Sequence, residues 1–262
     1  MGANRADPHR RAGAAALAED ALLGGRVRLL QPAEGYRAAI DPVFLAAAVP
    51  AAGGETVLAV GAGAGAAALC LAARVVDVRV CGIEIAPDLV RLAARSAGLN
   101  GLGGRVDFTA GDLLRPPARL AAETFDHVMA NPPYLPAGRG NPPPDAAKAA
   151  AHVEGAAGLE DWLGFCVAMV RPKGSVTLIH RADRLDAVLA ALRGRAGGIV
   201  VFPLWPGGPD AGQRPAKRVI VRALKGAAAP LRLAPGLVLH EAGGAFTPEA
   251  EAVLRDAGGL RL

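Results

Sequence analysis

The residues with the clearest chemical potential are Asn131, Pro132, Pro133 and Tyr134, which follow the apolar run 125–130. Two consecutive prolines fix φ near about −65° and keep each preceding residue extended, so the backbone carbonyls are held in place without a helix or a sheet. Asn131 adds a side-chain carbonyl acceptor, and Tyr134 adds a flat aromatic face. This elbow suits a planar substrate with an NH2 group at its edge. The competing interpretation is a plain proline-rich turn, of the kind that 142–144 also indicates.

A glycine-rich turn precedes this elbow in the chain. Residues 56–60 are apolar and predict a buried strand, Gly61, Gly63 and Gly65 form the turn, and the alanine-rich stretch 66–74 predicts a helix. Such turns let a ligand approach the backbone closely and leave N–H groups free at the start of the helix. The same residues satisfy the pattern of nicotinamide and flavin dinucleotide sites, which remains a competitor, as does a purely structural turn.

Acidic and polar residues then end the next predicted strands. Glu84 lies at the end of the predicted strand 79–85, where its carboxylate would bind ribose hydroxyls whichever nucleotide cofactor the glycine turn holds. Asp112 follows the strand 105–109, where a carboxylate can accept an adenine N–H. Because ligands of such sheets bind outside the carboxyl ends of the strands, these residues and the elbow should converge on one crevice. A dehydrogenase has no evident use for the Asn-Pro-Pro-Tyr elbow at that place.

The elements that must position these residues alternate along the chain. Predicted strands at 56–60, 79–85, 105–109, 125–129, 175–179, 199–202 and 217–223 are separated mostly by predicted helices. This alternation predicts an α/β fold with a doubly wound, mostly parallel, seven-stranded sheet and an antiparallel strand at its end. We expect residues 1–20 to be a flexible basic arm and residues 21–262 to be a single domain, in which Asp41 caps a helix that begins with Pro42.

Composition narrows the class of protein. The 262 residues carry a net charge of +5, which is compatible with an anionic partner such as nucleic acid. The uncharged run 56–73 is long enough for a membrane span, but its glycines and alanines fit a strand, a loop and a helix better. No secretory signal is visible, and the three cysteines form no CxxC pair. A cytoplasmic protein without a membrane segment or a metal site is therefore expected.

With these motifs the chain resembles the class I S-adenosylmethionine-dependent methyltransferases, which have a Rossmann-like fold. More narrowly, it resembles the amino-methyltransferases with an Asn-Pro-Pro-Tyr motif, and within them the bacterial tRNA1(Val) adenine-37 N6-methyltransferase family. The resemblance covers nearly everything after the first twenty residues. It is carried by Leu22–Pro32, Gly35–Asp41, the glycine turn, Asn131–Tyr134, Lys217–Val221 and Leu237–Glu251.

The resemblance implies S-adenosylmethionine as the cofactor and assigns residues to its parts. The three glycines of the turn would pass beneath the methionine moiety, Glu84 would hold the ribose, Asp112 would read the adenine, and Asp41 would border the pocket. One departure stands out. Ala59 occupies a position where the family usually has an acid that helps to hold the methionine end, so this contact is missing.

The resemblance also implies a mechanism. The Asn131 side-chain oxygen and the Pro132 carbonyl would accept the two N–H groups of an exocyclic amine. These acceptors would bind more strongly as the nitrogen becomes positive while attacking the methyl group. Pro133 keeps the elbow rigid, and Tyr134 would stack on the target base. No metal and no dedicated general base are required, and His127 and His152 are interpreted as structural or loop residues.

For the substrate, tRNA or another structured RNA is the expected partner, and the oligomeric state stays open. Two alternatives remain. A protein glutamine N5-methyltransferase uses the same elbow, although its relatives usually carry an N-terminal helical domain that about twenty residues before Leu22 are too few to supply. A non-catalytic RNA-binding module with a decayed cofactor site would explain Ala59. Candidate phosphate contacts are Arg26, Arg28, Arg37, Arg214, Lys217 and Arg218.

Overall fold

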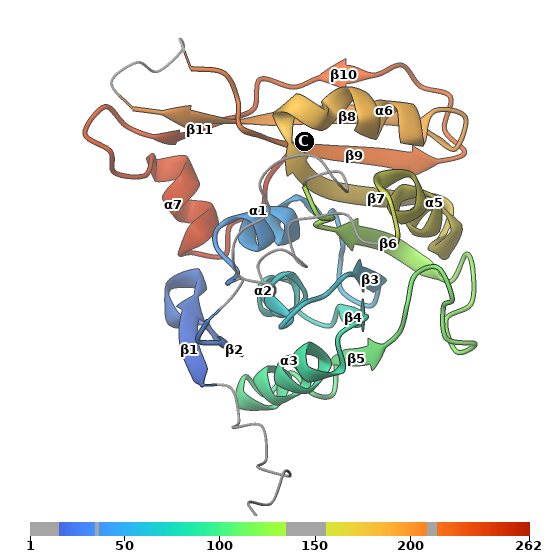
Figure 1. Cartoon of the computed structure of the whole chain (residues 1–262). Coiled ribbons are helices and arrows are strands. Elements are labelled where there is room, and N and C mark those ends of the chain that lie inside the picture. The colour runs from blue at the N-terminus through green and yellow to red at the C-terminus, as the bar shows by residue number, and fades with distance from the viewer. Residues whose placement is uncertain (1–15, 35–36, 135–155, 209–213) are drawn as a thin grey trace, which may run out of the picture.

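The computed structural model describes residues 16–34, 37–134, 156–208 and 214–262, and its centre is one large sheet (Figure 1). The spatial order of its strands is β10-β8-β9-β7-β6-β3-β4-β5, and β11 also pairs with β8, which makes nine strands. Their bounds are β3 (Thr56–Val60), β4 (Arg79–Glu84), β5 (Val106–Ala110), β6 (Phe125–Ala130), β7 (Val170–Arg181), β8 (Ala196–Gly207), β9 (Arg218–Lys225), β10 (Arg232–Leu233) and β11 (Leu237–His240).

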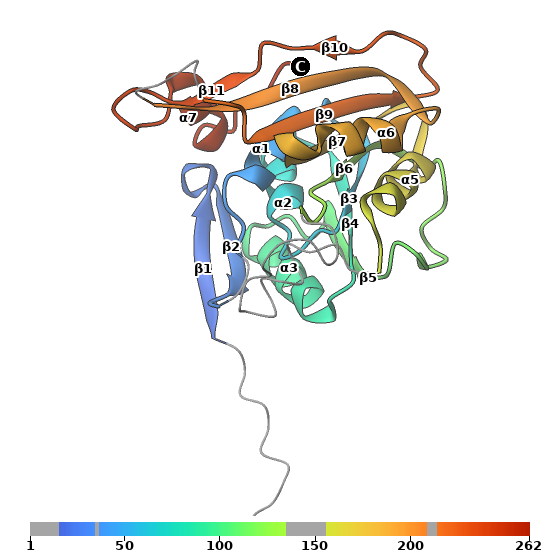
Figure 2. The same cartoon turned by 45° about the horizontal axis from the view of Figure 1, so that its top comes forward.

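Helices cover both faces of this sheet, as Figure 2 shows. Residues of α1 (Asp41–Ala48), α2 (Ala66–Arg74), α3 (Pro87–Leu99) and α7 (Pro248–Leu254) belong to one apolar core cluster, whereas α5 (Leu159–Met169) and α6 (Leu185–Leu192) belong to a second. Strand β3 contributes side chains to both clusters, because successive side chains of a strand point to opposite faces. Val57 and Ala59 lie in the first cluster, and Leu58 and Val60 lie in the second.

The predicted sheet is confirmed as mostly parallel, with two differences. The seven expected strands are present as β5-β4-β3-β6-β7-β9-β8, and the short strands β10 and β11 extend the sheet by pairing with β8. The antiparallel strand is not at the end of the seven. It is β9, which lies between β7 and β8 and runs antiparallel to both.

A separate two-stranded sheet precedes the large one. It pairs β1 (Leu17–Leu22) with β2 (Val27–Pro32) in antiparallel register. The sequence placed residues 17–20 in a flexible arm, and that boundary is wrong, because Glu19 and Asp20 lie opposite Leu30 and Leu29 of β2. Residues 1–15 of the predicted arm lie outside the described residues.

The uncharged run 56–73 folds as β3, the glycine turn and most of α2. Among the described residues, none of the helices has the length and apolarity that a membrane crossing needs.

Candidate active site

The predicted site residues end neighbouring strands at the carboxyl edge of the sheet. Val60 of β3 lies beside Ile83 of β4 and Ala130 of β6, so the glycine turn, Glu84 and Asn131 follow at the same level. Glu84 lies beside Ala110 of β5, two residues before Asp112. The order along the edge is therefore Asp112, Glu84, the glycine turn and Asn131, which confirms that they share one side of the sheet.

The three glycines of the turn have different neighbours. All adopt positive φ, at 64° for Gly61, 57° for Gly63 and 94° for Gly65. A Cβ on Gly61 would lie 2.4 Å from the Trp162 ring, and one on Gly65 would lie 2.8 Å from the Phe108 ring. A Cβ on Gly63 would meet nothing within 4 Å. Packing within the protein thus requires two of the glycines, and only Gly63 faces open space that a ligand can enter.

Glu84 is buried and is bound to the glycine turn. Its Oε2 accepts the Gly63 N–H at 2.9 Å, and its Oε1 accepts the Ala86 N–H at 2.9 Å. Each carboxylate oxygen has a second lone pair, so Glu84 can still accept hydrogen bonds from two neighbouring hydroxyl groups. Its position at the end of β4 directs this capacity toward the carboxyl edge.

Asp112 follows β5, and two exposed apolar residues also follow these strand ends, Ile85 after β4 and Leu114 after β5. Asp112 Oδ1 accepts the Leu114 N–H at 2.9 Å, which fixes the turn after β5. Ile85, directly after Glu84, is 68% exposed, and Leu114 is 42% exposed. Large apolar side chains exposed beside a carboxylate suit a flat heterocycle with an N–H at its edge. Neither Ile85 nor Leu114 was predicted as a site residue, although an apolar residue directly after a strand-ending acid was a usable signal.

The Asn-Pro-Pro-Tyr elbow ends β6, and its tyrosine is turned into the protein. The Tyr134 Oη lies 2.6 Å from Asp41 Oδ2 and 2.7 Å from Asn131 Oδ1. Only 8% of Tyr134 is exposed. The elbow therefore holds Asn131 and Tyr134 in direct contact, and the tyrosine hydroxyl has a role in addition to its ring.

Asp41 has a different local role from the one predicted. Ile40 is the N-cap of α1, and Asp41 is the first residue of the helix without a capping hydrogen bond from its side chain. Its carboxylate instead receives the Arg218 Nε–H at 2.9 Å and faces Tyr134. The predicted helix start is confirmed, but the capping role is wrong because these partners take the side chain.

Two residues around Tyr134 were missed or misjudged from the sequence. The Arg218 guanidinium carbon lies 4.5 Å from the centre of the Tyr134 ring, and His180, which is fully buried, meets the ring edge-on at 5.4 Å. A base could therefore reach the Arg218 face of Tyr134 only if Arg218 moved. Burial lowers the pKa of His180 to about 4, with smaller contributions from the positive charges of Arg184 and Arg218.

Ala59 occupies the position where the resembled family usually has an acidic residue. Its side chain is 3% exposed and lies in the first apolar cluster. A carboxylate at this position would have to be buried, and burial of an unpaired carboxylate is costly. The alanine is thus consistent with its surroundings in this chain.

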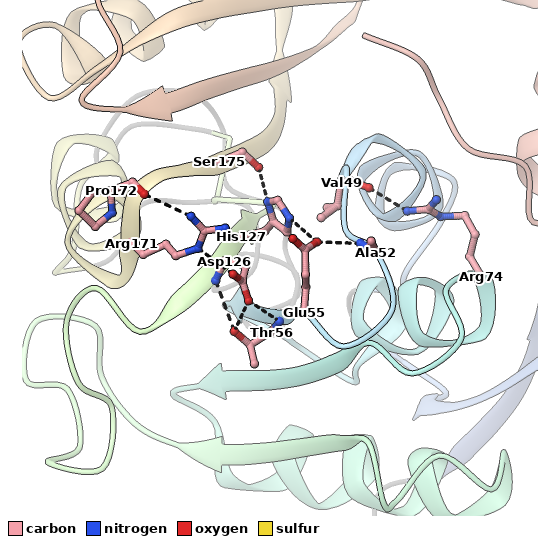
Figure 3. Close-up of polar contacts among 10 residues, drawn as sticks. All are labelled: Val49, Ala52, Glu55, Thr56, Arg74, Asp126, His127, Arg171, Pro172 and Ser175. Atoms are coloured by element: carbon pink, nitrogen blue, oxygen red, sulfur yellow. Dashed lines mark hydrogen bonds and ion pairs between the residues drawn. The ribbon is translucent and has the colours of Figure 1, made fainter.

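A second polar cluster lies at the opposite, amino-terminal edge of the sheet (Figure 3). His127 Nδ1 lies 2.8 Å from Ser175 Oγ, and His127 Nε2 lies 3.0 Å from Glu55 Oε2. This order of groups resembles a nucleophilic triad, but Ser175 is only 1% exposed and His127 is 8% exposed. A substrate cannot reach a buried hydroxyl, so the cluster connects strands and performs no chemistry.

Asp126 completes this second cluster. Its Oδ2 accepts the Thr56 N–H at 2.8 Å and the Thr56 hydroxyl at 2.9 Å, and its Oδ1 accepts from Arg171 at 2.7 Å. Burial opposes the charged form, but the Thr56 and Arg171 hydrogen bonds outweigh it and lower the pKa of Asp126 to about 2. His152, the other histidine that we interpreted as structural, lies outside the described residues.

The candidate phosphate contacts divide into two groups. Arg26 donates to backbone carbonyls, Arg28 pairs with Glu19 at 2.7 Å, Arg37 pairs with Asp20, and Arg218 pairs with Asp41. Arg214 and Lys217 are exposed. In the described part of the chain, no group of three or more His, Cys, Asp or Glu side chains could hold a metal ion.

Comparisons with known proteins show what the chain is similar to. A family model described as "Methyltransferase domain" matches residues 57–153. The chain is 29% identical over 150 residues to the tRNA1(Val) (adenine(37)-N6)-methyltransferase of Aeromonas hydrophila, which covers 57% of this chain and 61% of that protein. It is also 38% identical over 80 residues to the release factor glutamine methyltransferase of Geobacter sulfurreducens. This match covers 30% of this chain and 26% of that protein. The chain thus spans less than two thirds of the length of either relative.

A solved structure gives the same result for the fold. The crystal structure of a predicted O-methyltransferase from Agrobacterium tumefaciens superposes with a TM-score of 0.69 and 29% sequence identity, over 84% of this chain and 98% of that one.

Proposed function

We infer that this chain, which has the class I methyltransferase fold and S-adenosylmethionine as its cofactor, transfers a methyl group to an exocyclic amino nitrogen, and that the substrate is N6 of an adenine in tRNA. The observation that carries the amino-methyltransferase part is the Asn131–Tyr134 elbow at the carboxyl end of β6, next to the glycine turn of β3.

The residues at the carboxyl edge fit the cofactor. Asp112 and Glu84 would hold the adenine and the ribose, and the turn at Gly61, Gly63 and Gly65 would hold the methionine moiety, with open space above Gly63. Three strand spacings of about 4.8 Å separate β5 from β6, so this row of groups is roughly 14 Å long. Asp41, which we expect to border this pocket, is in contact with the elbow through Tyr134. When bound, S-adenosylmethionine supplies an electrophilic methyl group.

The elbow would prepare the substrate amine. The Asn131 side-chain oxygen and the Pro132 carbonyl accept its two N–H groups and fix the direction of the nitrogen lone pair. As positive charge develops on the nitrogen, both acceptors bind it more strongly than they bind the neutral amine, which lowers the barrier. Pro133 limits movement of the elbow, so this alignment costs little entropy at the moment of reaction.

The extent of the sequence matches favours tRNA over protein as the substrate. Matches to tRNA1(Val) adenine-37 methyltransferases cover 49–57% of this chain, whereas matches to release factor glutamine methyltransferases cover 30–35%. The exposed Arg214 and Lys217 are available to contact phosphates.

A protein glutamine N5-methyltransferase is the second candidate. It is favoured by the higher identity of 38–41% to several release factor glutamine methyltransferases over about 80 residues. A glutamine amide also presents an NH2 group at a planar edge, so the elbow accepts both substrates.

The test is transfer of labelled methyl groups from S-adenosylmethionine to an unmodified valine tRNA transcript and, separately, to a purified release factor. We expect label in the tRNA, recovered as N6-methyladenosine, and none with an Asn131→Ala variant. Label in the release factor alone would establish the second candidate. Binding of RNA without cofactor binding and without transfer to either substrate would support a non-catalytic RNA-binding module with a decayed cofactor site.

A further inference from the structure

We propose that Arg218, Asp41 and Tyr134 form a hydrogen-bonded chain that holds the Asn131 amide with its oxygen directed toward the substrate amine. The three are positioning residues, because they act through Asn131. This inference rests on the proposed function, in which the Asn131 oxygen is an acceptor for the amine.

The chain of contacts is continuous and joins distant parts of the sequence. Arg218 Nε donates to Asp41 Oδ2 at 2.9 Å, Asp41 Oδ2 lies 2.6 Å from Tyr134 Oη, and Tyr134 Oη lies 2.7 Å from Asn131 Oδ1. Arg218 belongs to β9, Asp41 to α1, and the other two residues follow β6. These contacts join groups that are 93 and 177 residues apart in the sequence.

The number of protons determines the orientation of the amide. A phenol has one proton, yet Tyr134 Oη lies within hydrogen-bond distance of two oxygens, which cannot both receive it. The Asp41 carboxylate is the stronger acceptor, because hydrogen bonds to a charged partner are shorter and stronger. Tyr134 therefore donates to Asp41, and its oxygen becomes an acceptor toward Asn131.

Two acceptor oxygens cannot face each other across 2.7 Å, so Asn131 must present a donor to Tyr134. The oxygen and nitrogen of an amide occupy nearly equivalent positions and are assigned from the hydrogen-bond network. Turning the Asn131 amide by half a rotation brings Nδ2–H to Tyr134 and satisfies every group in the chain. The Asn131 oxygen then lies at the end of the amide away from Tyr134, where it remains available to the amine.

The surroundings of Tyr134 hold this arrangement in place. Arg218 covers one face of the ring, and the ring of the buried His180 stands nearly perpendicular to it, at an interplanar angle of 80°. The Asp41 and Arg218 side chains are 15% and 30% exposed, which protects the ion pair from solvent. A comparable ion pair between Arg171 and Asp126, with an Nε to Oδ1 distance of 2.7 Å at the opposite edge, touches no proposed site residue and provides a matched control.

The amide orientation can be measured without any assay of activity. The chain has four asparagines, Asn4, Asn100, Asn131 and Asn141, so protein labelled with ¹⁵N-asparagine gives four side-chain NH2 signals, and loss of one in Asn131→Ala identifies Asn131. In the wild type we expect one Asn131 proton to exchange with water at least about tenfold more slowly than in Tyr134→Phe. Asn100, whose Nδ2 donates to Arg28 and Ser96 carbonyls, should be unaffected by this substitution.

The second variant is Asp41→Asn, which covers the case in which Tyr134→Phe does not fold. An amide at position 41 can donate to the Tyr134 oxygen, so the hydroxyl would turn its proton to the Asn131 oxygen and remove that acceptor from the substrate. We expect the slowly exchanging Asn131 proton to be lost here as well.

Kinetics give an independent measurement. Tyr134→Phe, Asp41→Asn and Arg218→Met should each lower kcat by about tenfold to a hundredfold, the range of one charge-assisted hydrogen bond, with little change in the cofactor KM. Arg218→Lys should recover part of the loss, and Arg171→Met should lower stability but leave kcat unchanged.

The outcomes separate this proposal from the proposed function. If the Asn131 signals respond as expected but neither tRNA nor release factor is methylated, the positioning chain stands and the proposed function fails. If the Asn131 proton exchanges equally fast in the wild type, Tyr134→Phe and Asp41→Asn, the positioning chain is wrong, whatever the activity.

Discussion

Polar clusters lie at both ends of the strands, one at the amino-terminal edge of the sheet and one at the carboxyl edge. The two clusters differ in how their hydrogen bonds are satisfied. At the amino-terminal edge, the Ser175 hydroxyl can donate to His127 Nδ1 while His127 Nε2–H donates to Glu55, so each proton has one acceptor. At the carboxyl edge, the single proton of Tyr134 faces Asp41 and Asn131 together. In the proposed arrangement Tyr134 donates to Asp41 and accepts from the Asn131 nitrogen, so the Asn131 oxygen keeps its capacity for a ligand, whereas the amino-terminal cluster uses its groups to connect strands.

The largest expected effect comes from removing the acceptor at the carboxyl edge. Asn131→Ala should lower kcat by at least about a thousandfold, since the developing charge on the amine loses a preorganised partner. Calorimetry should show nearly unchanged affinity for S-adenosylmethionine, because Asn131 lies beyond the glycine turn. Asn100→Ala, which removes hydrogen bonds to Arg28, is the control and should cost only stability. Wild-type turnover in Asn131→Ala would show that the elbow is not catalytic.

The two edges should also respond to acid in different pH ranges. The pKa of His180 falls from 6.5 to about 4 on folding, so below pH 6.5 the unfolded chain binds a proton that the folded chain does not. Stability should therefore decrease as the pH falls from 6.5 to 4, by about 3 kcal/mol in total, and His180→Gln should abolish this slope.

Asp126, at the amino-terminal edge, should affect the pH dependence of stability only at lower pH. Its pKa falls from 3.8 to about 2 on folding, so its contribution is complete above pH 3.8 and is lost as the pH falls toward 2. Denaturant titrations across both ranges, with Asp126→Asn as the second variant, measure the two slopes separately. A slope between pH 6.5 and 4 that survives in His180→Gln would contradict the assignment.

An intermediate effect on stability is expected from the second polar cluster, at the amino-terminal edge. His127→Ala leaves Ser175 and Glu55 without a partner and should lower the free energy of unfolding by about 2 kcal/mol, the cost of unsatisfied buried polar groups. Turnover should not change at a temperature where the variant is folded. A tenfold loss of kcat in a folded variant would mean that this edge takes part in the reaction after all.

The smallest expected effect is on cofactor affinity, and it is measured by comparing two glycines, one on either side of β3. Gly54 and Gly63 have φ of 86° and 57°, and a Cβ at either would meet nothing within 4 Å, so alanine imposes similar backbone strain of about 1 kcal/mol. Only Gly63 lies at the carboxyl edge. Gly63→Ala should weaken cofactor binding about tenfold, equivalent to about 1.4 kcal/mol, and Gly54→Ala should leave it unchanged. Equal affinities in the two variants would place the cofactor elsewhere.

The sequence was informative where function depends on how a strand ends. Gly61, Glu84 and Asn131 each follow an apolar run, and parallel strands bring their ends to one edge, so the row of groups was predictable. The cluster around Tyr134 was not, because no local pattern connects Asp41 with a residue 177 positions later. Strand β1 was missed because its sequence, LAEDAL, has weak strand propensity and forms a strand only by pairing with β2.

The position of β9 has a consequence for how the molecule is made. In the finished sheet β9 separates β7 from β8, yet the ribosome makes β7 and β8 first. Until residues 218–225 emerge, β8 has no neighbour through which to join the sheet, and the edge of β7 stays open to strands of other chains. The glycine turn and the elbow can assemble during this interval, but Arg218 arrives with β9 itself. The strand that inserts between β7 and β8 thus both closes the vulnerable edge of β7 and completes the cluster that orients Asn131.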